Sequence, residues 1–495
     1  MNAVVKDRAA VPALKDPKLF RENGYIDGAW AEADSRARFE VRNPADGTLV
    51  GSVPNMGVAE TKRAIAAAEA ALPAWRALAA KERSKILRNW FNLIVANADD
   101  LALLLTTEQG KPLAEAKGEI MYGASFVEWF AEEAKRVYGD VIPSPTNDRR
   151  IIVIKQPIGV VAAITPWNFP TAMITRKVAP GLAVGCTFVL KPAEQTPLSA
   201  LALAELAERA GFPKGVLNIV TGDPAPIGQE LCASSVVRKV TFTGSTEVGR
   251  ILMRQSADTI KKLSLELGGN APFIVFDDAD LDAAAEGALA SKYRNAGQTC
   301  VCANRIYVQD TVYDAFAAKL AEKVKKFKVG RGTDEGVNIG PLIDNQGLAK
   351  VEDHVADAVG KGAKVMLGGK RHALGGLFFE PTILTEVTPD MKVSREETFG
   401  PVAPLYRFKK DEDAVKLANN TEFGLAAYFY ARDVGRIFRV AEAIESGMVG
   451  VNVGILANEV APFGGVKQSG LGREGSKYGI DDFLEIKYLA IGGIQ

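Results

Sequence analysis

The chain has 495 residues, 47% of them apolar and 24% charged, and these values exclude a disordered or fibrous protein. Because 60 basic residues balance 60 acidic ones, no overall field favours nucleic acid or an anionic membrane surface as a partner. No apolar run approaches the roughly 20 residues of a membrane-spanning helix. The first residues, Met1 to Phe20, lack the apolar stretch of a secretory signal, so we expect a soluble, cytoplasmic protein.

Residues 58–105 are rich in Ala and Leu, with charges at helical spacing, which predicts two or more amphipathic helices. From residue 151 onward, short β-branched runs alternate with helical stretches. This alternation predicts β-α-β crossovers and mainly parallel sheets. We expect strands at 151–154, 159–165, 187–191, 216–221, 239–243, 271–276 and 305–308, and helices at 198–210, 281–293 and 312–327.

The alternation falls into two runs, which predicts two α/β domains divided near Leu263. Between the first helices and the first parallel strands, residues 136–156 contain Pro143, Pro145 and two β-like runs. This segment is more typical of a hairpin arm than of either sheet.

Four cysteines in a chain of this length, two of them at Cys300 and Cys302, do not form a disulfide framework. With two histidines and no Cys-x-x-Cys pair, we expect no metal site.

Two segments match patterns for dinucleotide binding. The run Gly470–Gly475 fits G-x-G-x-x-G, but it follows a loop instead of a strand, so we interpret it as a loop. A better candidate is 239–249, where a strand enters a turn at Gly244, Ser245 can cap the following helix, and Gly249 lies in its first turns. Such a helix start offers free N–H groups to a pyrophosphate, although an ordinary strand–turn–helix junction has the same pattern.

The strand at 187–191 ends in Lys191 and is followed closely by Glu194. An acidic residue at this place in a nucleotide-binding sheet accepts hydrogen bonds from the adenosine ribose, and Lys191 could share that task. A carboxylate would also repel a 2′-phosphate, so Glu194 favours NAD over NADP. The alternative is a solvated pair in a turn.

Two further segments could carry chemistry. Cys300 lies in a Gly-flanked polar turn, where a thiol can be exposed and activated as a nucleophile, although most lone cysteines are inert core residues. Glu266 lies between leucines and before two glycines. Because burial of a carboxylate raises its pKa, Glu266 is a candidate general base.

Together with 164–170, 397–401 and 462–465, these segments make the chain similar to the NAD(P)-dependent aldehyde dehydrogenase superfamily, from about Tyr25 to Tyr488. The resemblance implies a Rossmann-variant cofactor domain, an α/β catalytic domain and a β-arm for oligomerisation. We accordingly expect an NAD-binding domain at 1–135 and 157–263, a catalytic domain at 264–465, and an arm at 136–156 and 480–495. It also implies a homodimer or homotetramer.

The resemblance implies roles for individual residues. Cys300 would attack the aldehyde, Asn168 and the Cys300 N–H would form the oxyanion hole, and Glu266 would activate water to hydrolyse the thioester. Lys177 and Glu474 match an internal proton path. The positions that match cofactor contacts are Thr165, Pro166, Trp167, Lys191, Glu194, Gly244, Ser245, Gly249, Glu397 and Phe399.

Within the superfamily, the chain is most similar to enzymes that oxidise succinate semialdehyde. Arg176 and Arg294 match positions beside the substrate tunnel, where two guanidinium groups would select an aldehyde with a distant carboxylate; the alternative is that they form structural ion pairs. Relatives place a serine where this chain has Ala457. Glutarate semialdehyde, another ω-oxo acid or a general aldehyde therefore remain alternative substrates.

Two other hypotheses concern the thiol. A reversible Cys300–Cys302 bridge would remove the nucleophile, whereas the alternative is that Cys302 is a bystander. A CoA-acylating relative would pass its thioester to another acceptor, but water activation by Glu266 would waste that intermediate.

Overall fold

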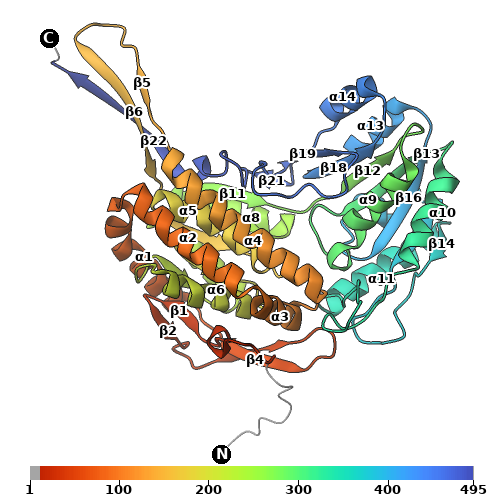
Figure 1. Cartoon of the computed structure of the whole chain (residues 1–495), viewed down its shortest axis with the longest axis horizontal. Coiled ribbons are helices and arrows are strands. Elements are labelled where there is room, and N and C mark those ends of the chain that lie inside the picture. Colours follow the sequence, from red (N-terminus) through yellow and green to blue (C-terminus); the bar gives the residue numbers. More distant parts are fainter. Residues whose placement is uncertain (1–11, 494–495) are drawn as a thin grey trace, which may run out of the picture.

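The computed structural model describes residues 12–493, so the ends of the predicted first domain (1–11) and of the predicted arm (494–495) lie outside the described residues. It confirms the α/β class. Two lobes are each built on a large sheet, and a smaller sheet projects from the first lobe (Figure 1). The helices and strands expected from the sequence all form, with bounds within a few residues of those predicted.

The first lobe contains an eight-stranded sheet, counted over the described residues, whose five central strands are parallel. Its central strands are buried on both faces, which explains why runs such as 187–191 are apolar without alternation. In spatial order the strands are β2 (Ala29–Ala31), β1 (Gly24–Ile26), β9 (Leu217–Ile219), β8 (Thr187–Lys191), β7 (Val160–Ile164), β10 (Val237–Thr243), β11 (Lys262–Glu266) and β21 (Gly470–Leu471).

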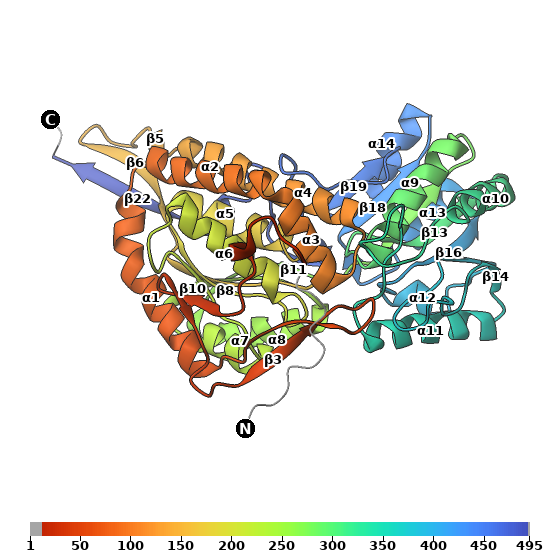
Figure 2. The same cartoon turned by 60° about the horizontal axis from the view of Figure 1, so that its bottom comes forward.

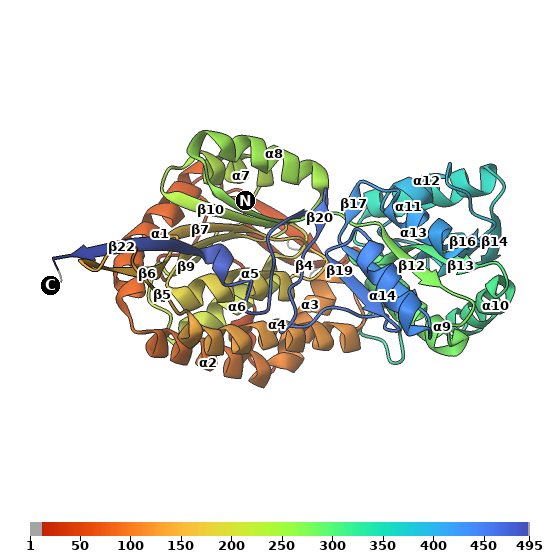
Figure 3. The same ribbon diagram turned by 90° about the horizontal axis from the view of Figure 1, so that it is seen from above.

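Helices cover both faces of this sheet (Figure 3). One face packs against α1 (Val58–Ala77), α7 (Pro224–Ala233) and α8 (Thr246–Ser256), and the other against α5 (Ala172–Val184) and α6 (Pro197–Ala210). Outside α5 and α6 lies a further helical layer of α2 (Ala80–Ala96), α3 (Ala98–Gln109) and α4 (Leu113–Glu133) (Figure 2). The hairpin of β3 (Arg38–Arg42) and β4 (Leu49–Pro54) also belongs to this half of the chain.

The second lobe has its own hydrophobic core around a seven-stranded sheet, parallel except at its first edge. Its strands are β14 (Lys364–Leu367), β15 (Thr382–Thr385), β16 (Val402–Phe408), β13 (Ala303–Gln309), β12 (Ala271–Val275), β18 (Ala426–Tyr430) and β19 (Met448–Val451). Its helices are α9 (Leu281–Tyr293), α10 (Tyr313–Val324), α11 (Asn345–Gly360), α12 (Lys392–Arg395), α13 (Asp411–Asn419) and α14 (Val434–Ala443). A short pair, β17 (Phe423–Gly424) and β20 (Val466–Lys467), lies apart from both large sheets.

The projecting sheet combines β5 (Asp140–Ile142), β6 (Arg149–Pro157) and β22 (Leu484–Gly492), so the end of the described chain pairs with a segment more than 300 residues earlier (Figure 1). The division expected near Leu263 falls inside β11, the last parallel strand of the first sheet. The G-x-G-x-x-G run begins in β21, antiparallel to β11, and turns follow it instead of a helix. None of the described helices is long and apolar enough to cross a membrane.

Candidate active site

The carboxyl ends of three adjacent parallel strands carry the motifs expected to react or bind. Thr165 to Asn168 follow β7, Gly244 and Ser245 follow β10, and Glu266 ends β11. Ile164 pairs with Phe242, and Thr243 with Glu266, so these ends meet at one edge of the sheet. Ligands of α/β sheets bind at such an edge, which makes it the candidate site.

A cavity of about 390 Å³ opens at this edge. The predicted site residues that line it are Pro166, Trp167, Asn168, Gly244, Ser245, Cys300, Glu397 and Phe399. The structure therefore brings together residues from both lobes that are separated by more than 200 positions in the sequence.

The start of α8 opens onto the cavity as the sequence predicts. Ser245 is the N-cap, and its hydroxyl oxygen accepts the Val248 N–H at 3.3 Å. Gly249 packs against Leu267, and a Cβ there would lie 2.5 Å from a methyl group of the leucine, which would have to move. The first N–H groups of α8 are left available to an anion.

Lys191 and Glu194 form an ion pair of 2.9 Å at the end of β8. Lys191 is buried and Glu194 half-buried, and burial lowers the pKa of Lys191 while Glu194 opposes that shift. Neither of them lines the 390 Å³ cavity, nor do Thr165 or Gly249. These four expected contacts lie beside the cavity instead of in its wall.

The nucleophile candidate follows an unusual backbone segment. Asn295, Ala296 and Gly297 have φ values of 50°, 54° and 76°, so three consecutive residues are left-handed just before the turn that holds Cys300. The Cys300 side chain is half-buried and lines the cavity. Cys302 is buried, its Sγ lies 3.3 Å from the Lys292 carbonyl oxygen, and both cysteines are free thiols.

Burial and four charged residues shift the pKa of the Cys300 thiol. Burial raises its pKa to about 12; Arg176 and Arg294 act in the opposite direction, and Glu266 and Glu397 reinforce the rise. The resting group is therefore a neutral thiol, and its attack on a substrate requires loss of a proton to a neighbouring base.

Glu266 is a buried candidate for that base, although it lines neither cavity that Cys300 lines. It is 3% exposed, and neither of its carboxyl oxygens has a hydrogen-bond partner among the described residues. Burial raises its pKa to about 8, and repulsion from Glu474 adds to the shift. A carboxyl group tuned in this way can take and release protons near neutral pH.

Glu474 lies between two cations of α5. Lys177 Nζ contacts Glu474 Oε1, and Arg176 Nε donates to Oε2 at 2.5 Å. Burial would raise the pKa of Glu474, but these two cations outweigh it and hold the pKa below its usual value. The structure thus places Lys177 and Glu474 in direct contact, as the proton-path hypothesis requires, and commits Arg176 to the same carboxylate.

A second, narrow cavity of about 20 Å³ meets the first at Asn168, Thr243 and Cys300. Both predicted arginines and Ala457 line it. The Arg294 guanidinium stacks over Phe169 at 5.3 Å and forms no ion pair within the described residues. Arg294 is therefore free to bind an anionic group, whereas Arg176 is already paired.

Glu397 and Phe399 close the cavity from the second lobe. Glu397 Oε1 accepts the Gly269 N–H at 3.1 Å, and burial raises the pKa of Glu397 to about 7. Phe399 is left-handed, with φ 55°, and stacks edge-on against Trp167 with ring centroids 5.5 Å apart. This contact joins the two lobes in the wall of the cavity that Cys300 also lines.

Sequence reasoning missed the part of the wall contributed by α11. Asp344 caps this helix by accepting the Gly347 N–H at 2.8 Å, and Gln346, Gly347 and Lys350 face the cavity. An Asp directly before a helical run is an ordinary N-cap signal, so the helix start was detectable but its function was not. The other missed wall residues are Thr243, Leu267, Gly268, Gln298, Ile343 and Thr398.

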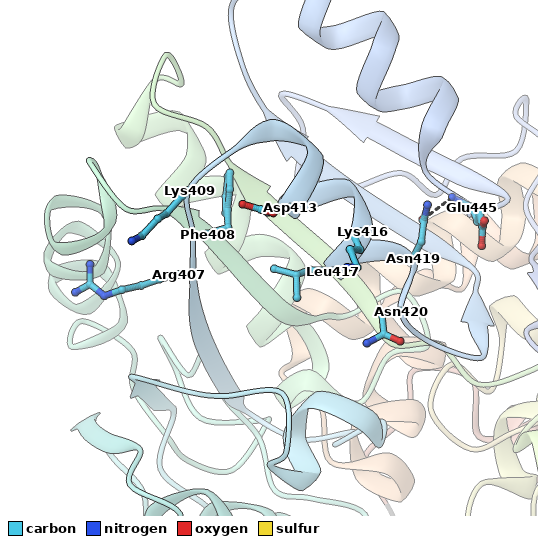
Figure 4. Close-up of a pocket in the computed structure, with 9 residues that line it drawn as sticks. All are labelled: Arg407, Phe408, Lys409, Asp413, Lys416, Leu417, Asn419, Asn420 and Glu445. Carbon is cyan, nitrogen blue, oxygen red and sulfur yellow. Dashed lines mark hydrogen bonds between the residues drawn. The ribbon is translucent and has the colours of Figure 1, made fainter.

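A further cavity of about 700 Å³ lies in the second lobe, between the end of β16 and α13 (Figure 4). None of the predicted site residues lines it. Its charges are partly committed already, because Arg407 pairs with Asp310 at 3.0 Å and Glu445 contacts Lys467. We therefore place the chemistry at the edge of the first sheet.

The fold and this edge define an α/β protein with a candidate dinucleotide site at the carboxyl ends of its parallel strands. The model of the aldehyde dehydrogenase family matches residues 30–489, and the chain belongs to this family. It is 68% identical over 481 residues to a glutarate-semialdehyde dehydrogenase of Pseudomonas aeruginosa (97% of this chain, 100% of the relative). It is 67% identical over 479 residues to an NADP(+) succinate-semialdehyde dehydrogenase of Escherichia coli (97% and 99%).

Solved structures agree. A crystal structure of succinate-semialdehyde dehydrogenase from Burkholderia pseudomallei has a TM-score of 0.96 and 68% identity, and the match covers 97% of this chain and 100% of that one. The family likeness predicted from the sequence is confirmed along nearly the whole chain.

Proposed function

We propose that this enzyme oxidises an aldehyde that carries a distant carboxylate, with succinate semialdehyde as the expected substrate, succinate as the product and NAD(P)+ as the oxidant. The observation that carries the proposal is the position of the Cys300 thiol at the junction of two cavities. The wider cavity suits a dinucleotide. The narrow one contains the unpaired guanidinium of Arg294.

The chain's own groups supply the first step. The Cys300 sulfur bonds to the aldehyde carbon as the thiol proton passes to the Glu266 carboxylate, while the Asn168 amide and the Cys300 N–H stabilise the alkoxide that develops. In this structure the Asn168 Nδ2 donates to the Gln298 carbonyl at 3.1 Å, so the donor already lies beside the thiol loop. Bound NAD(P)+ supplies the hydride acceptor that converts the adduct to a thioester.

Several residues fit that dinucleotide. The start of α8 offers N–H groups to phosphate, Glu397 offers a carboxylate to a ribose hydroxyl, and Lys191 with Glu194 lies at the next strand end. The carboxylate of Glu194 would repel a 2′-phosphate, which favours NAD+. Its partner Lys191 could attract the same phosphate, so NADP+ is retained as a second cofactor.

Glu266 is the proposed general base for hydrolysis of the thioester. It would take a proton from water as the water attacks the carbonyl carbon. Glu266 then has to pass that proton on. The adjacent Glu474 and Lys177 provide buried groups that exchange a proton with each other through their direct contact.

Arg294 is the residue we assign to the substrate carboxylate. A guanidinium that lacks a partner in a narrow cavity is stabilised by a carboxylate bound there. Ala457 contributes no hydroxyl to this end of the cavity. The preferred number of carbons between the aldehyde and the carboxylate of the substrate therefore depends more on packing than on a second polar contact. Glutarate semialdehyde is the alternative substrate.

We also propose that the projecting sheet joins subunits into a homodimer or homotetramer. Its strands expose apolar side chains that water does not favour, including Val141 (77% exposed) and Ile486 (73%). Sedimentation velocity should give a mass of two or four chains. A monomer at micromolar concentration would contradict this part of the proposal.

A cytoplasmic location forms part of the same proposal. All four cysteines are free, which is typical of proteins in a reducing compartment.

The proposed chemistry is tested by trapping the thioester. In Glu266→Gln, one equivalent of NADH per active site should form with succinate semialdehyde, more slowly than in the first turnover of the wild type because the candidate base for Cys300 is also lost. Further NADH should form only as fast as the adduct decays, and mass spectrometry should find a succinyl adduct on Cys300. Rapid steady turnover without an adduct would refute the roles of both residues.

A further inference from the structure

A completely buried ion pair lies beneath the candidate oxyanion hole. Lys111, in the loop between α3 and α4, places its Nζ 2.6 Å from Glu119 Oε2, and the two side chains are 1% and 0% exposed. Burial lowers the pKa of Lys111, and the Glu119 carboxylate opposes that shift. Apolar residues could fill such a place at no loss of stability, so a buried ion pair calls for a reason beyond stability.

The ammonium group reaches the backbone of the residue that carries the oxyanion donor. Lys111 Nζ donates to the Asn168 carbonyl oxygen at 2.7 Å, and Asn295 Nδ2 donates to the same oxygen at 3.0 Å. The Phe169 ring lies 3.9 Å from Nζ. Two buried donors therefore fix the peptide plane of Asn168, and with it the direction of its side-chain amide.

The carboxylate of the pair holds the next helix. Glu119 Oε1 accepts the N–H groups of Thr171 at 2.9 Å and Ala172 at 3.2 Å, at the first turn of α5. This helix carries Arg176 and Lys177 to their contacts with Glu474. One ion pair thus positions both the oxyanion loop and the proton-path helix.

The same loop also reaches the backbone before the nucleophile. Gln109 Oε1 accepts the Lys111 N–H at 2.9 Å, and Gln109 Nε2 donates to Asn295 Oδ1 at 3.1 Å. Glu115 Oε2 accepts the Asn295 N–H at 2.8 Å. These contacts hold Asn295 in its left-handed conformation, five residues before Cys300.

We propose that Lys111, paired with Glu119, is a positioning residue. It holds the Asn168 amide and the Cys300 loop in the relative orientation that attack on the aldehyde requires. It touches no reacting atom. The inference rests on the proposed function, because it assigns a purpose to the alignment of those two groups.

The test compares Lys111→Met, Glu119→Gln and the double variant with a matched control, Lys261→Met. Lys261 is also a buried lysine whose Nζ donates to main-chain carbonyls, but these belong to Ser234 and Val237, outside both cavities. Each variant is assayed for its melting temperature, for kcat and KM, and for hydrogen exchange of peptides spanning 166–170 and 295–300.

We expect Lys111→Met to lower kcat by about ten- to a hundredfold with little change in KM, because misplaced donors weaken transition-state binding. Both peptides should exchange faster. The double variant leaves no unpaired buried charge, so it should recover melting temperature but not kcat. Lys261→Met should lose melting temperature alone.

Recovery of kcat together with melting temperature in the double variant would overturn the proposal, as would a kcat of Lys111→Met within twofold of the control. If Lys111→Met fails to fold, Asn295→Asp removes the other donor to the Asn168 carbonyl and should lower kcat with KM unchanged; an unchanged kcat would refute the proposal. A wild type that forms no NAD(P)H while Lys111→Met still accelerates exchange would refute the proposed function, not the positioning role.

Discussion

The two arginines at the narrow cavity should respond differently to the same substitution. Arg294 has no ion-pair partner among the described residues, so Arg294→Leu breaks no salt bridge. It removes what the guanidinium gives to the substrate, and also the effect of its charge on the pKa of Cys300, which both substrates share. A charge-assisted hydrogen bond to a buried carboxylate is worth about 1.5–3 kcal/mol. We therefore expect kcat/KM for succinate semialdehyde to fall by roughly 10- to 150-fold.

Butanal supplies the internal reference, because it has the same carbon chain without the acid. Its kcat/KM should fall far less than that of the acid in Arg294→Leu, since no guanidinium–carboxylate contact is lost and only the effect on the pKa of Cys300 remains. NADH formation at saturating NAD+ measures both substrates in one assay. A loss of equal size for both would mean that Arg294 is structural, and would refute the reasoning.

Arg176→Leu is the matched comparison, because it leaves the buried Glu474 with Lys177 as its single partner. Breaking a buried pair costs about 3–5 kcal/mol of stability, so this variant should unfold at a lower temperature and lose activity toward both substrates alike. A loss confined to the acid substrate would assign the clamp to Arg176 as well.

Three further predictions follow from the site. Burial raises the pKa of Glu266 to about 8, and only its ionised form accepts a proton, so kcat of the wild type should rise with pH through about 8. The slow decay of the succinyl adduct in Glu266→Gln should lack this limb. Glu194→Ser should raise the ratio of kcat/KM for NADP+ to kcat/KM for NAD+ by about tenfold. The reason is that the carboxylate that repels a 2′-phosphate is removed while Lys191 remains. An unchanged ratio would show that residues other than Glu194 select the cofactor. If Cys300 and Cys302 form a bridge, mild oxidant should inactivate the enzyme, dithiothreitol should restore it, and Cys302→Ala should resist; equal inactivation of that variant would contradict the bridge.

The sequence predicts four of the five central parallel strands of the first sheet because they are apolar and bounded by turns. It does not predict β11 or the edge strands β1, β2 and β21. It does not reveal α5, whose 13 residues are all buried and which contains Pro180, so neither amphipathic periodicity nor propensity marks it as a helix. The many strands of the second lobe that follow β13 carry no motif of their own. Their arrangement depends on long-range packing in one hydrophobic core.

Motifs of the candidate site are readable because chemistry restricts them to a few residue types in a fixed order. The pairing of Arg176 with Glu474 cannot be predicted from the sequence, since the two residues are 298 positions apart. Nothing in the local sequence distinguishes an arginine that binds the substrate carboxylate from one that forms an ion pair. Lys111 and Glu119 are hidden for a related reason. Charges at that spacing near a helix start usually face solvent, and only the packed structure shows that they are buried under Asn168.

The most direct test of the central claim is kcat/KM for succinate semialdehyde beside that for butanal, measured as NADH formation by the wild-type enzyme. A preference of about a hundredfold or more for the acid, roughly 2.7 kcal/mol of differential transition-state binding, is the result we predict. Equal values would show that neither arginine recognises a carboxylate, and would make the protein a general aldehyde dehydrogenase.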